Sequence, residues 1–259
     1  MKNIYLYTFL NKINKNELTL GLMAFEFMTP GLPSIVSASG ADFLIYDTEH
    51  SGCGIETIKQ QVAYARGLDL YPIARLPGIH KYLISTFLDA GIKGIMLPSV
   101  SSEKQARDIV KWCRYRPEGN RGLGFNVAHD NYTAGDPLNK MKIANSENMI
   151  IVLIETVEGL NEIDKIMSIP EIDIGWLGHY DLTDSMSITG KFDHPTFLKG
   201  VDKFLNACLK NGKKAGILDL NIDMLIKFKK IGFSILGYGH DVMVFQKSLN
   251  SGFSLLRDN

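Results

Sequence analysis

Side chains that can do metal and acid–base chemistry follow four short apolar runs of the sequence. Glu155 and Asp181 follow two of these runs, a third run ends in Asp47-Thr-Glu-His50, and a fourth ends in Arg75. Carboxylate oxygens suit Mg²⁺ or Mn²⁺, and two protein ligands leave coordination positions open for a substrate and water. Together these residues indicate a hard divalent metal beside a base and a fixed positive charge.

The two carboxylates also fit a structural role. The segments Glu155–Glu158 and Asp181–Asp184 both resemble helix starts, and either carboxylate could instead pair with a nearby arginine. Position alone leaves both interpretations open. The other charged residues that follow apolar runs favour the metal.

His50 is a candidate base, because an unperturbed imidazole has a pKa of about 6.5. Its structural alternative is a hydrogen bond to a backbone carbonyl. An arginine directly after an apolar run is costly unless it meets an anion, so Arg75 either binds an anionic substrate group or pairs with Asp47 or Glu49. Asp89, at the end of the next predicted helix, either lies on the surface or reaches back to His50.

The elements that would position these residues alternate along the chain. Eight short runs are almost continuously apolar, which is typical of parallel strands covered on both faces. The predicted strands are Thr19–Phe25, Phe43–Tyr46, Pro72–Ala74, Gly94–Leu97, Met149–Ile154, Ile174–Leu177, Ala215–Leu218 and Ser234–Leu236. Segments with helical spacing lie between them, including Ile55–Arg66, Glu103–Cys113 and Phe197–Leu209.

This alternation, without a Pro/Ser-rich linker, predicts an α/β fold: a single (β/α)₈ TIM barrel over residues 1–259. In such a barrel the carboxyl ends of all strands meet at the rim where chemistry takes place. The interval Arg114–Asn148 departs from the alternation and is expected to be a long loop. Its segment Arg114–Gly124 holds three arginines, which fits either closure over an anionic substrate or a solvated turn.

Composition limits the classes of partner. Basic and acidic residues number 28 each, so no broad field favours nucleic acid or an anionic membrane. No apolar stretch approaches the roughly 20 residues that a membrane-spanning helix needs, and Met1–Leu10 is expected to be a first helix rather than a signal sequence. The three cysteines form no CxxC pair, which favours a reducing compartment. We therefore expect a cytoplasmic protein.

Taken together, several segments resemble the HpcH/HpaI family of class II, metal-dependent pyruvate aldolases. The similarity runs roughly from Gly21 to Gly252, and its matching segments occur in the family's order. The segments are Asp47-Thr-Glu-His50, Ala74-Arg75, Leu88-Asp89-Ala-Gly91, Leu97-Pro98, Arg114–Gly124, Ile154-Glu-Thr156, Gly178-His-Tyr-Asp-Leu182 and Gly216-Ile-Leu218.

The resemblance implies a role for each matching residue. Glu155 and Asp181 would be the ligands of a divalent metal, Mg²⁺ or Mn²⁺, with Co²⁺ as a further option. His50 would be the base, Asp89 would raise its basicity, and Arg75 would stabilise the developing enolate. Asp47 and Glu49 would hold metal-bound water. The pyruvate carboxylate would bind to the backbone around Gly178, His179, Tyr180 and Asp181.

The resemblance also implies an activity and an assembly. The reaction would be the reversible cleavage of a 4-hydroxy-2-oxo acid into pyruvate, or a close 2-oxo acid, and an aldehyde. The alternatives are a condensing enzyme of the same family, like a citrate-forming siderophore enzyme, and a barrel that binds a 2-oxo acid or metal without catalysis. The family implies a homohexamer, a dimer of trimers, whose last helix is exchanged between subunits.

Two positions depart from the family pattern. Many members have Gly-Pro-Ala-Asp where this chain has Gly178-His-Tyr-Asp181, and many have a glutamine where Leu153 stands. His179 and Tyr180 add bulk and hydrogen-bonding groups, whereas Leu153 removes an amide. Metal binding is compatible with both changes, but the family's substrate does not transfer directly to this chain.

Overall fold

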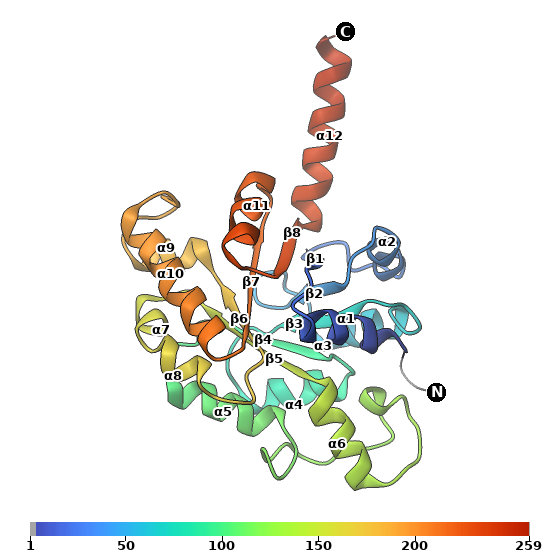
Figure 1. The fold of residues 1–259 in the computed structure, drawn as a ribbon. Coiled ribbons are helices and arrows are strands. Elements are labelled where there is room, and N and C mark those ends of the chain that lie inside the picture. Colours follow the sequence, from blue (N-terminus) through green and yellow to red (C-terminus); the bar gives the residue numbers. More distant parts are fainter. Residues whose placement is uncertain (1–3, 259) are drawn as a thin grey trace.

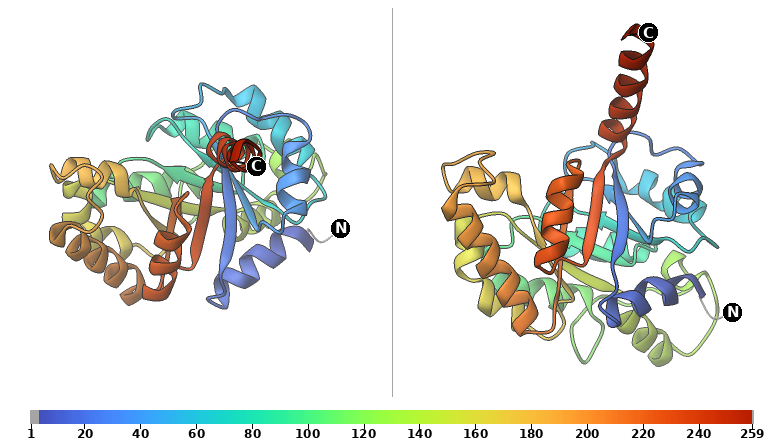
Figure 2. Two further views of the ribbon diagram at one scale, coloured as in Figure 1. Left: turned by 90° about the horizontal axis from the view of Figure 1, so that it is seen from above. Right: turned by 45° about the horizontal axis from the view of Figure 1, so that its top comes forward.

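Eight parallel strands close into one barrel in the computed structural model, which describes residues 4–258. Each strand pairs with the next one along the chain, and β8 closes the ring against β1 (Figures 1 and 2). The strands are β1 Thr19–Ala24, β2 Phe43–Asp47, β3 Tyr71–Arg75, β4 Gly94–Leu97, β5 Met149–Ile154, β6 Ile174–Leu177, β7 Lys214–Asp219 and β8 Ile235–His240. The predicted (β/α)₈ fold is confirmed.

Helices surround the barrel (Figure 2). They are α1 Ile4–Asn14, α2 Leu32–Ala38, α3 Ile55–Tyr64, α4 Lys81–Asp89, α5 Glu103–Cys113, α6 Pro137–Glu147, α7 Val157–Asn161, α8 Ile163–Met167, α9 His179–Ser185, α10 Pro195–Lys210, α11 Ile222–Ile231 and α12 Asp241–Asp258, with a 3₁₀ turn at Ala128–Asp130. The predicted first helix is present as α1, and Met1–Asn3 of that prediction lie outside the described residues. Among residues 4–258, no helix combines the length and apolarity needed to span a membrane.

The strands are apolar on both faces because each face meets its own core. Met149, Ile151 and Leu153 of β5 belong to the cluster inside the barrel. The alternate residues of β5 pack outward against the helices. Helix α1 covers the amino-terminal opening, where Phe9 stacks on Tyr71 with ring centroids 4.2 Å apart. The carboxyl-terminal rim is therefore the end that remains for a site.

The prediction of one long loop over Arg114–Asn148 is wrong, because α6 occupies its second half. Asp136 caps this helix by accepting a hydrogen bond from the backbone N–H of Asn139, and Pro137 opens it. Only Ala144 of α6 is buried. The helix therefore lacks the apolar face from which sequence reasoning recognises a helix.

Close packing between β1 and β2 depends on Gly21. A Cβ atom at this position would lie 2.4 Å from the Phe43 ring and 2.5 Å from the Phe43 backbone oxygen. We expect Gly21→Ala to lower the free energy of unfolding by about 1–3 kcal/mol, because the backbone oxygen can move only with the sheet. Urea denaturation would measure the change. Gly122→Ala is the control, since a Cβ there has no atom within 4 Å, and equal stability of the two variants would contradict this account.

Candidate active site

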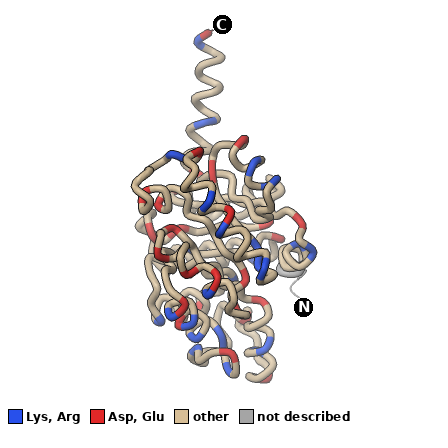
Figure 3. Tube along the Cα trace, turned by 60° about the vertical axis from the view of Figure 1, so that its left-hand side comes forward, with Lys and Arg blue, Asp and Glu red and all other residues tan. Residues whose placement is uncertain are grey.

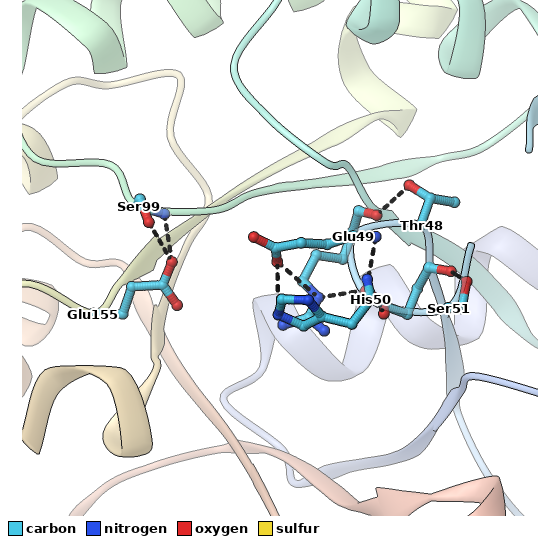
Figure 4. A network of polar contacts seen from close by, with 8 residues as sticks. Thr48, Glu49, His50, Ser51, Ser99 and Glu155 are labelled. Atoms are coloured by element: carbon cyan, nitrogen blue, oxygen red, sulfur yellow. Dashed lines mark hydrogen bonds and ion pairs between the residues drawn. The ribbon is translucent and has the colours of Figure 1, made fainter. Parts of the chain in front are cut away.

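The carboxyl ends of four strands bring most of the predicted site residues to one rim. Asp47 is the last residue of β2 and Arg75 is the last residue of β3. Glu155 directly follows β5, and Asp181 lies in the first turn of α9, just beyond β6. Figure 4 shows the carboxylate of Glu49 extending toward the side of the barrel that carries Glu155.

Arg75 is held by two carboxylates from the end of β2. Its Nε lies 2.6 Å from Asp47 Oδ1 and 3.3 Å from Glu49 Oε2. Asp47 is fully buried, and its other oxygen accepts a hydrogen bond of 2.9 Å from the backbone N–H of His50. The pairing of Arg75 with Asp47 or Glu49, which the sequence left as the alternative to an anionic substrate group, is present with both carboxylates. The carboxylates fix the guanidinium in place and also shape the turn that presents His50.

His50 is exposed, with 63% of its side chain accessible. Its Nε2 lies 3.9 Å from Glu49 Oε2, so the imidazole stands beside a carboxylate without a close hydrogen bond to it. Among residues 4–258, no hydrogen bond to a buried group holds the ring. The side chain is free to reach a substrate at the rim.

Glu155 is buried, with 6% of the residue exposed, and hydrogen bonds hold its carboxylate on one side. Its Oε1 accepts hydrogen bonds from the backbone N–H and the hydroxyl of Ser99, at 2.7 and 2.8 Å (Figure 4). Burial raises the pKa of Glu155, the Ser99 hydrogen bonds oppose this, and the charges of Asp181 and Glu49 add to it. Burial likewise raises the pKa of Glu49, against the attraction of Arg75 and His50.

Ser99 is a site residue that the sequence analysis missed. It stands two positions beyond β4, the same kind of place from which the other site residues were chosen. Its left-handed backbone, with φ of 51°, turns its N–H and hydroxyl toward one carboxylate oxygen. A search for hydroxyl residues after strands would have found it.

Within residues 4–258, the second oxygen of Glu155 has no hydrogen-bond partner, and it lies next to Gly178. A Cβ at Gly178 would lie 2.7 Å from Glu155 Oε2, so only glycine leaves room for this oxygen. Asp181 is exposed, and its carboxylate has no hydrogen-bond partner within residues 4–258. The charge of Asp181 raises the pKa of Glu155, so the two carboxylates lie near each other. Two neighbouring carboxylates suit a hard divalent cation.

Glu155 and Asp181 are the two candidate protein ligands for such a cation. Within the described part of the chain, no group of three or more His, Cys, Asp or Glu residues is arranged to hold a metal ion. A metal bound by Glu155 and Asp181 would complete its coordination with water and substrate oxygens, which suits Mg²⁺ and Mn²⁺. The donor set therefore fits the predicted type of metal.

Asp89 is the one predicted catalytic residue that the structure does not bring to this rim. It ends α4, five residues before β4 begins, and so lies toward the amino-terminal end of the barrel. Its Oδ1 accepts a hydrogen bond of 2.6 Å from Arg121, whose side chain is fully buried. Within one chain, Asp89 therefore partners Arg121 and makes no contact with His50.

The arginines that open and close the segment 114–121 also have internal partners. Arg114 donates to the backbone oxygens of Asn145, Asn148 and Glu171 and to the carboxylate of Asp173. Both Arg114 and Arg121 are buried. They hold the loop and α6 against the barrel, so closure of these two side chains over a substrate is not supported.

A second residue missed by the sequence analysis is Asp219, the last residue of β7. Its Oδ2 lies 2.8 Å from Nε2 of His179, and both residues are buried. Burial alone would raise the pKa of Asp219, but hydrogen bonds from His179 and the backbone N–H of Asn221 outweigh it, so the pKa is lowered. Asp219 is therefore a carboxylate at neutral pH. Its place after the apolar pair Ile217-Leu218 was the available signal.

Comparison with known proteins places the chain among aldolases. A model of the family described as HpcH/HpaI aldolase/citrate lyase matches residues 26–248. The chain is 30% identical over 241 residues to a hydroxypyruvate/pyruvate aldolase of Roseovarius nubinhibens, with 93% of each chain covered. It is 27% identical over 249 residues to a 2-keto-3-deoxy-L-rhamnonate aldolase of Escherichia coli, covering 96% of this chain and 92% of the relative.

Solved structures of similar proteins share the fold. An HpcH/HpaI aldolase from Desulfitobacterium hafniense superposes with a TM-score of 0.91 at 24% identity, with 96% of each chain covered. A citrate synthase, SbnG, superposes with a TM-score of 0.85 at 26% identity over 96% of each chain. The first similarity concerns the fold alone, whereas the second relates the chain to a protein named for a different activity.

Proposed function

The chain belongs to the HpcH/HpaI aldolase/citrate lyase family and is a carbon–carbon lyase, and we propose that it reversibly cleaves a 4-hydroxy-2-oxo acid into pyruvate, or a close 2-oxo acid, and an aldehyde. The observation that carries this proposal is that the carboxylates of Glu155 and Asp181 lie close enough to interact electrostatically, at the rim where Asp47 also fixes the guanidinium of Arg75. This arrangement suits a substrate that carries a carboxylate and a keto group side by side.

Glu155 and Asp181 would hold the divalent metal, for which we propose Mg²⁺ or Mn²⁺, with Co²⁺ as a further option. When bound, such an ion supplies Lewis acidity and a template for the two oxygens of a 2-oxo acid. The backbone around Gly178–Asp181 would receive the substrate carboxylate. Asp47 and Glu49 would orient water around this centre while they hold Arg75.

His50 would act as the base. Directly or through water, it would remove the proton from the C4 hydroxyl, the C3–C4 bond would break, and its electron pair would pass into the enol system of the 2-oxo acid. Arg75 would stabilise the negative charge that develops on the enolate oxygen. Protonation at C3 would then give pyruvate, and the reverse steps would give condensation.

The role of Asp89 as the partner that raises the basicity of His50 stays a prediction, because the structure contains a single copy of the chain. Because Asp89 lies toward the other end of its own barrel, such a contact would need a second copy of the chain. The pairing with Arg121 would then hold Asp89 in place for that contact.

A condensing enzyme is the second candidate, favoured by the similarity to the citrate synthase SbnG and by the departure at Gly178-His-Tyr-Asp181. Incubation of the purified protein with Mg²⁺, oxaloacetate and either aldehydes or acetyl-CoA would separate the two. Aldol products with aldehydes, abolished by EDTA and restored by Mn²⁺, are the result that our proposal predicts. Citrate formation from acetyl-CoA, without aldol products, would support the alternative.

Gly178→Ala tests the close approach of the backbone to Glu155. The added Cβ would lie 2.6 Å from Glu155 Cβ and 2.7 Å from Oε2, so the carboxylate must move. We expect Mn²⁺ affinity to fall by about 10- to 100-fold, the usual cost of disturbing the support of a metal ligand. Calorimetry would measure the affinity, with Gly122→Ala as the control. Unchanged Mn²⁺ affinity in Gly178→Ala would place the metal elsewhere.

We further propose that residues 1–259 form one domain that assembles into a hexamer and works in the cytoplasm. Helix α12 supports assembly, because it extends away from the barrel and buries only Asp241 (Figures 1 and 3). Between Lys247 and Arg257 the helix has no charged residue. Its exposed apolar side chains are Met243, Phe245, Leu249, Phe253, Leu255 and Leu256. A neighbouring subunit would cover them, as in the helix exchange expected above.

Deletion of residues 243–259 tests this assembly. Asp241 remains in the truncated chain, where its carboxylate accepts the backbone N–H groups of residues 25–27. The barrel should therefore stay folded while the oligomer dissociates to monomers. Light scattering after size exclusion would measure the mass, and circular dichroism would confirm the fold. A full-length chain that is already monomeric, or a truncated chain that stays oligomeric, would contradict the role of α12.

A further inference from the structure

A buried histidine–aspartate pair lies beside the proposed metal ligands, and the mechanism above gives its two side chains no role. His179 is the first residue of α9, and Asp219 is the last residue of β7. Their hydrogen bond of 2.8 Å joins the ends of two neighbouring strands, since α9 directly follows β6. His179 also adjoins Gly178, whose Cα faces Glu155. The pair is thus part of the rim at which the substrate would bind.

The hydrogen bond fixes which nitrogen of His179 carries a hydrogen. An ionised carboxylate can only accept, so Nε2 must be the donor to Asp219. In the neutral imidazole, Nδ1 is then a hydrogen-bond acceptor. Within residues 4–258, Nδ1 has no hydrogen-bond partner, and it is not one of the fully buried polar atoms that lack a partner. It is therefore in contact with solvent.

Two further interactions keep the imidazole in one orientation. The ring centroid of His179 lies 4.7 Å from that of Tyr180 and 5.0 Å from that of Phe192. Asp219 is itself held, because its Oδ1 accepts a hydrogen bond of 2.6 Å from the backbone N–H of Asn221. The result is a single acceptor atom presented from a rigid support.

We propose that Asp219 is a positioning residue that fixes His179 as the acceptor for a hydroxyl group of the aldehyde, so that the pair selects hydroxylated aldehydes over apolar ones of the same carbon skeleton. The inference rests on the proposed aldol reaction and adds the class of aldehyde to it. Between two aldehydes of one carbon skeleton, the hydroxylated one can donate a hydrogen bond to Nδ1 and the apolar one cannot. An apolar aldehyde would leave this atom without a partner, which is the kind of mismatch that enzymes discriminate against most strongly.

The test compares two aldehydes that differ by one hydroxyl group, glycolaldehyde and acetaldehyde, in condensation with pyruvate. Wild-type protein should prefer glycolaldehyde in kcat/KM by about 10- to 100-fold, the size expected for a hydrogen bond within a charged network. Asp219→Leu should remove most of this preference. Asp219→Asn should retain it, because the side-chain carbonyl can still accept from Nε2.

A second readout separates positioning from a general loss of structure. Exchange of the pyruvate methyl hydrogens in D₂O needs no aldehyde, so Asp219→Leu should lower its rate much less than it lowers kcat/KM for condensation with glycolaldehyde. His179→Phe should lose the preference as well, and the double variant should lose no more than either single variant. Asp173→Asn, which weakens an ion pair at the amino-terminal end of the barrel, is the control for reduced stability.

Each outcome decides the inference. An unaltered aldehyde preference in Asp219→Leu overturns it, and so does a fall in hydrogen exchange parallel to the fall in condensation. Absence of exchange and condensation in the wild-type protein with Mn²⁺ overturns the proposed function, and with it the inference. Loss of the preference with exchange largely retained supports both.

Discussion

Glu155→Gln is expected to lower kcat/KM for metal-dependent aldol cleavage by at least about 10²-fold, because it removes one of two proposed charged metal ligands. The glutamine oxygen can still accept the hydrogen bonds that Ser99 donates at 2.7 and 2.8 Å. The substitution also removes a buried charge that Asp181 and Glu49 repel. The melting temperature should therefore not fall, while Mn²⁺ binding measured by calorimetry should be lost.

The control for this variant is Glu158→Gln, which changes an exposed glutamate in α7. It should bind Mn²⁺ and turn over substrate like the wild-type protein. EDTA-insensitive activity in Glu155→Gln would rule out the metal role of Glu155. A lower melting temperature in Glu155→Gln would instead favour the structural interpretation of this carboxylate.

Arg75→Met is expected to lower kcat by about 10²–10³-fold, because the enolate oxygen loses its fixed positive charge. It should also destabilise the protein by about 3–5 kcal/mol, since the fully buried carboxylate of Asp47 loses its partner at 2.6 Å. Steady-state kinetics and urea denaturation would measure the two effects.

The two effects can be separated with a second substitution. In the double variant Arg75→Met/Asp47→Asn no buried carboxylate is left unpaired, so stability should largely recover while turnover stays low. Recovery of turnover together with stability would mean that Arg75 acts only through the fold. Arg75→Lys should give intermediate kinetics, because an ammonium group keeps the charge but not the Nε–H geometry.

The barrel was predictable because each of its strands is a short apolar run that can be recognised from neighbouring residues alone. The bounds of β4, β5 and β6 match the predicted runs, since an apolar run bounded by polar residues marks a parallel strand clearly. β8 extends beyond its prediction to His240, because the alternation of glycine and polar residues from Gly237 on hides the strand. Helix α6 was hidden for the related reason that its sequence shows almost no buried face.

The site was predictable where residues directly follow strands. Asp47, Arg75 and Glu155 were placed at one rim because parallel strands bring their carboxyl ends together. Ser99 and Asp219 obey the same rule and could have been found by it. Asp89 is the last residue of a helix, so the rule gives no information about it, and its pairing with Arg121 depends on how a distant loop packs.

Calorimetric titration of the protein with Mn²⁺ tests the central claim most directly. Our account predicts one bound Mn²⁺ per chain in the wild-type protein, with binding lost in both Glu155→Gln and Asp181→Asn and retained in Glu158→Gln. Absence of Mn²⁺ uptake by the wild-type protein, or uptake that survives both substitutions, would contradict it.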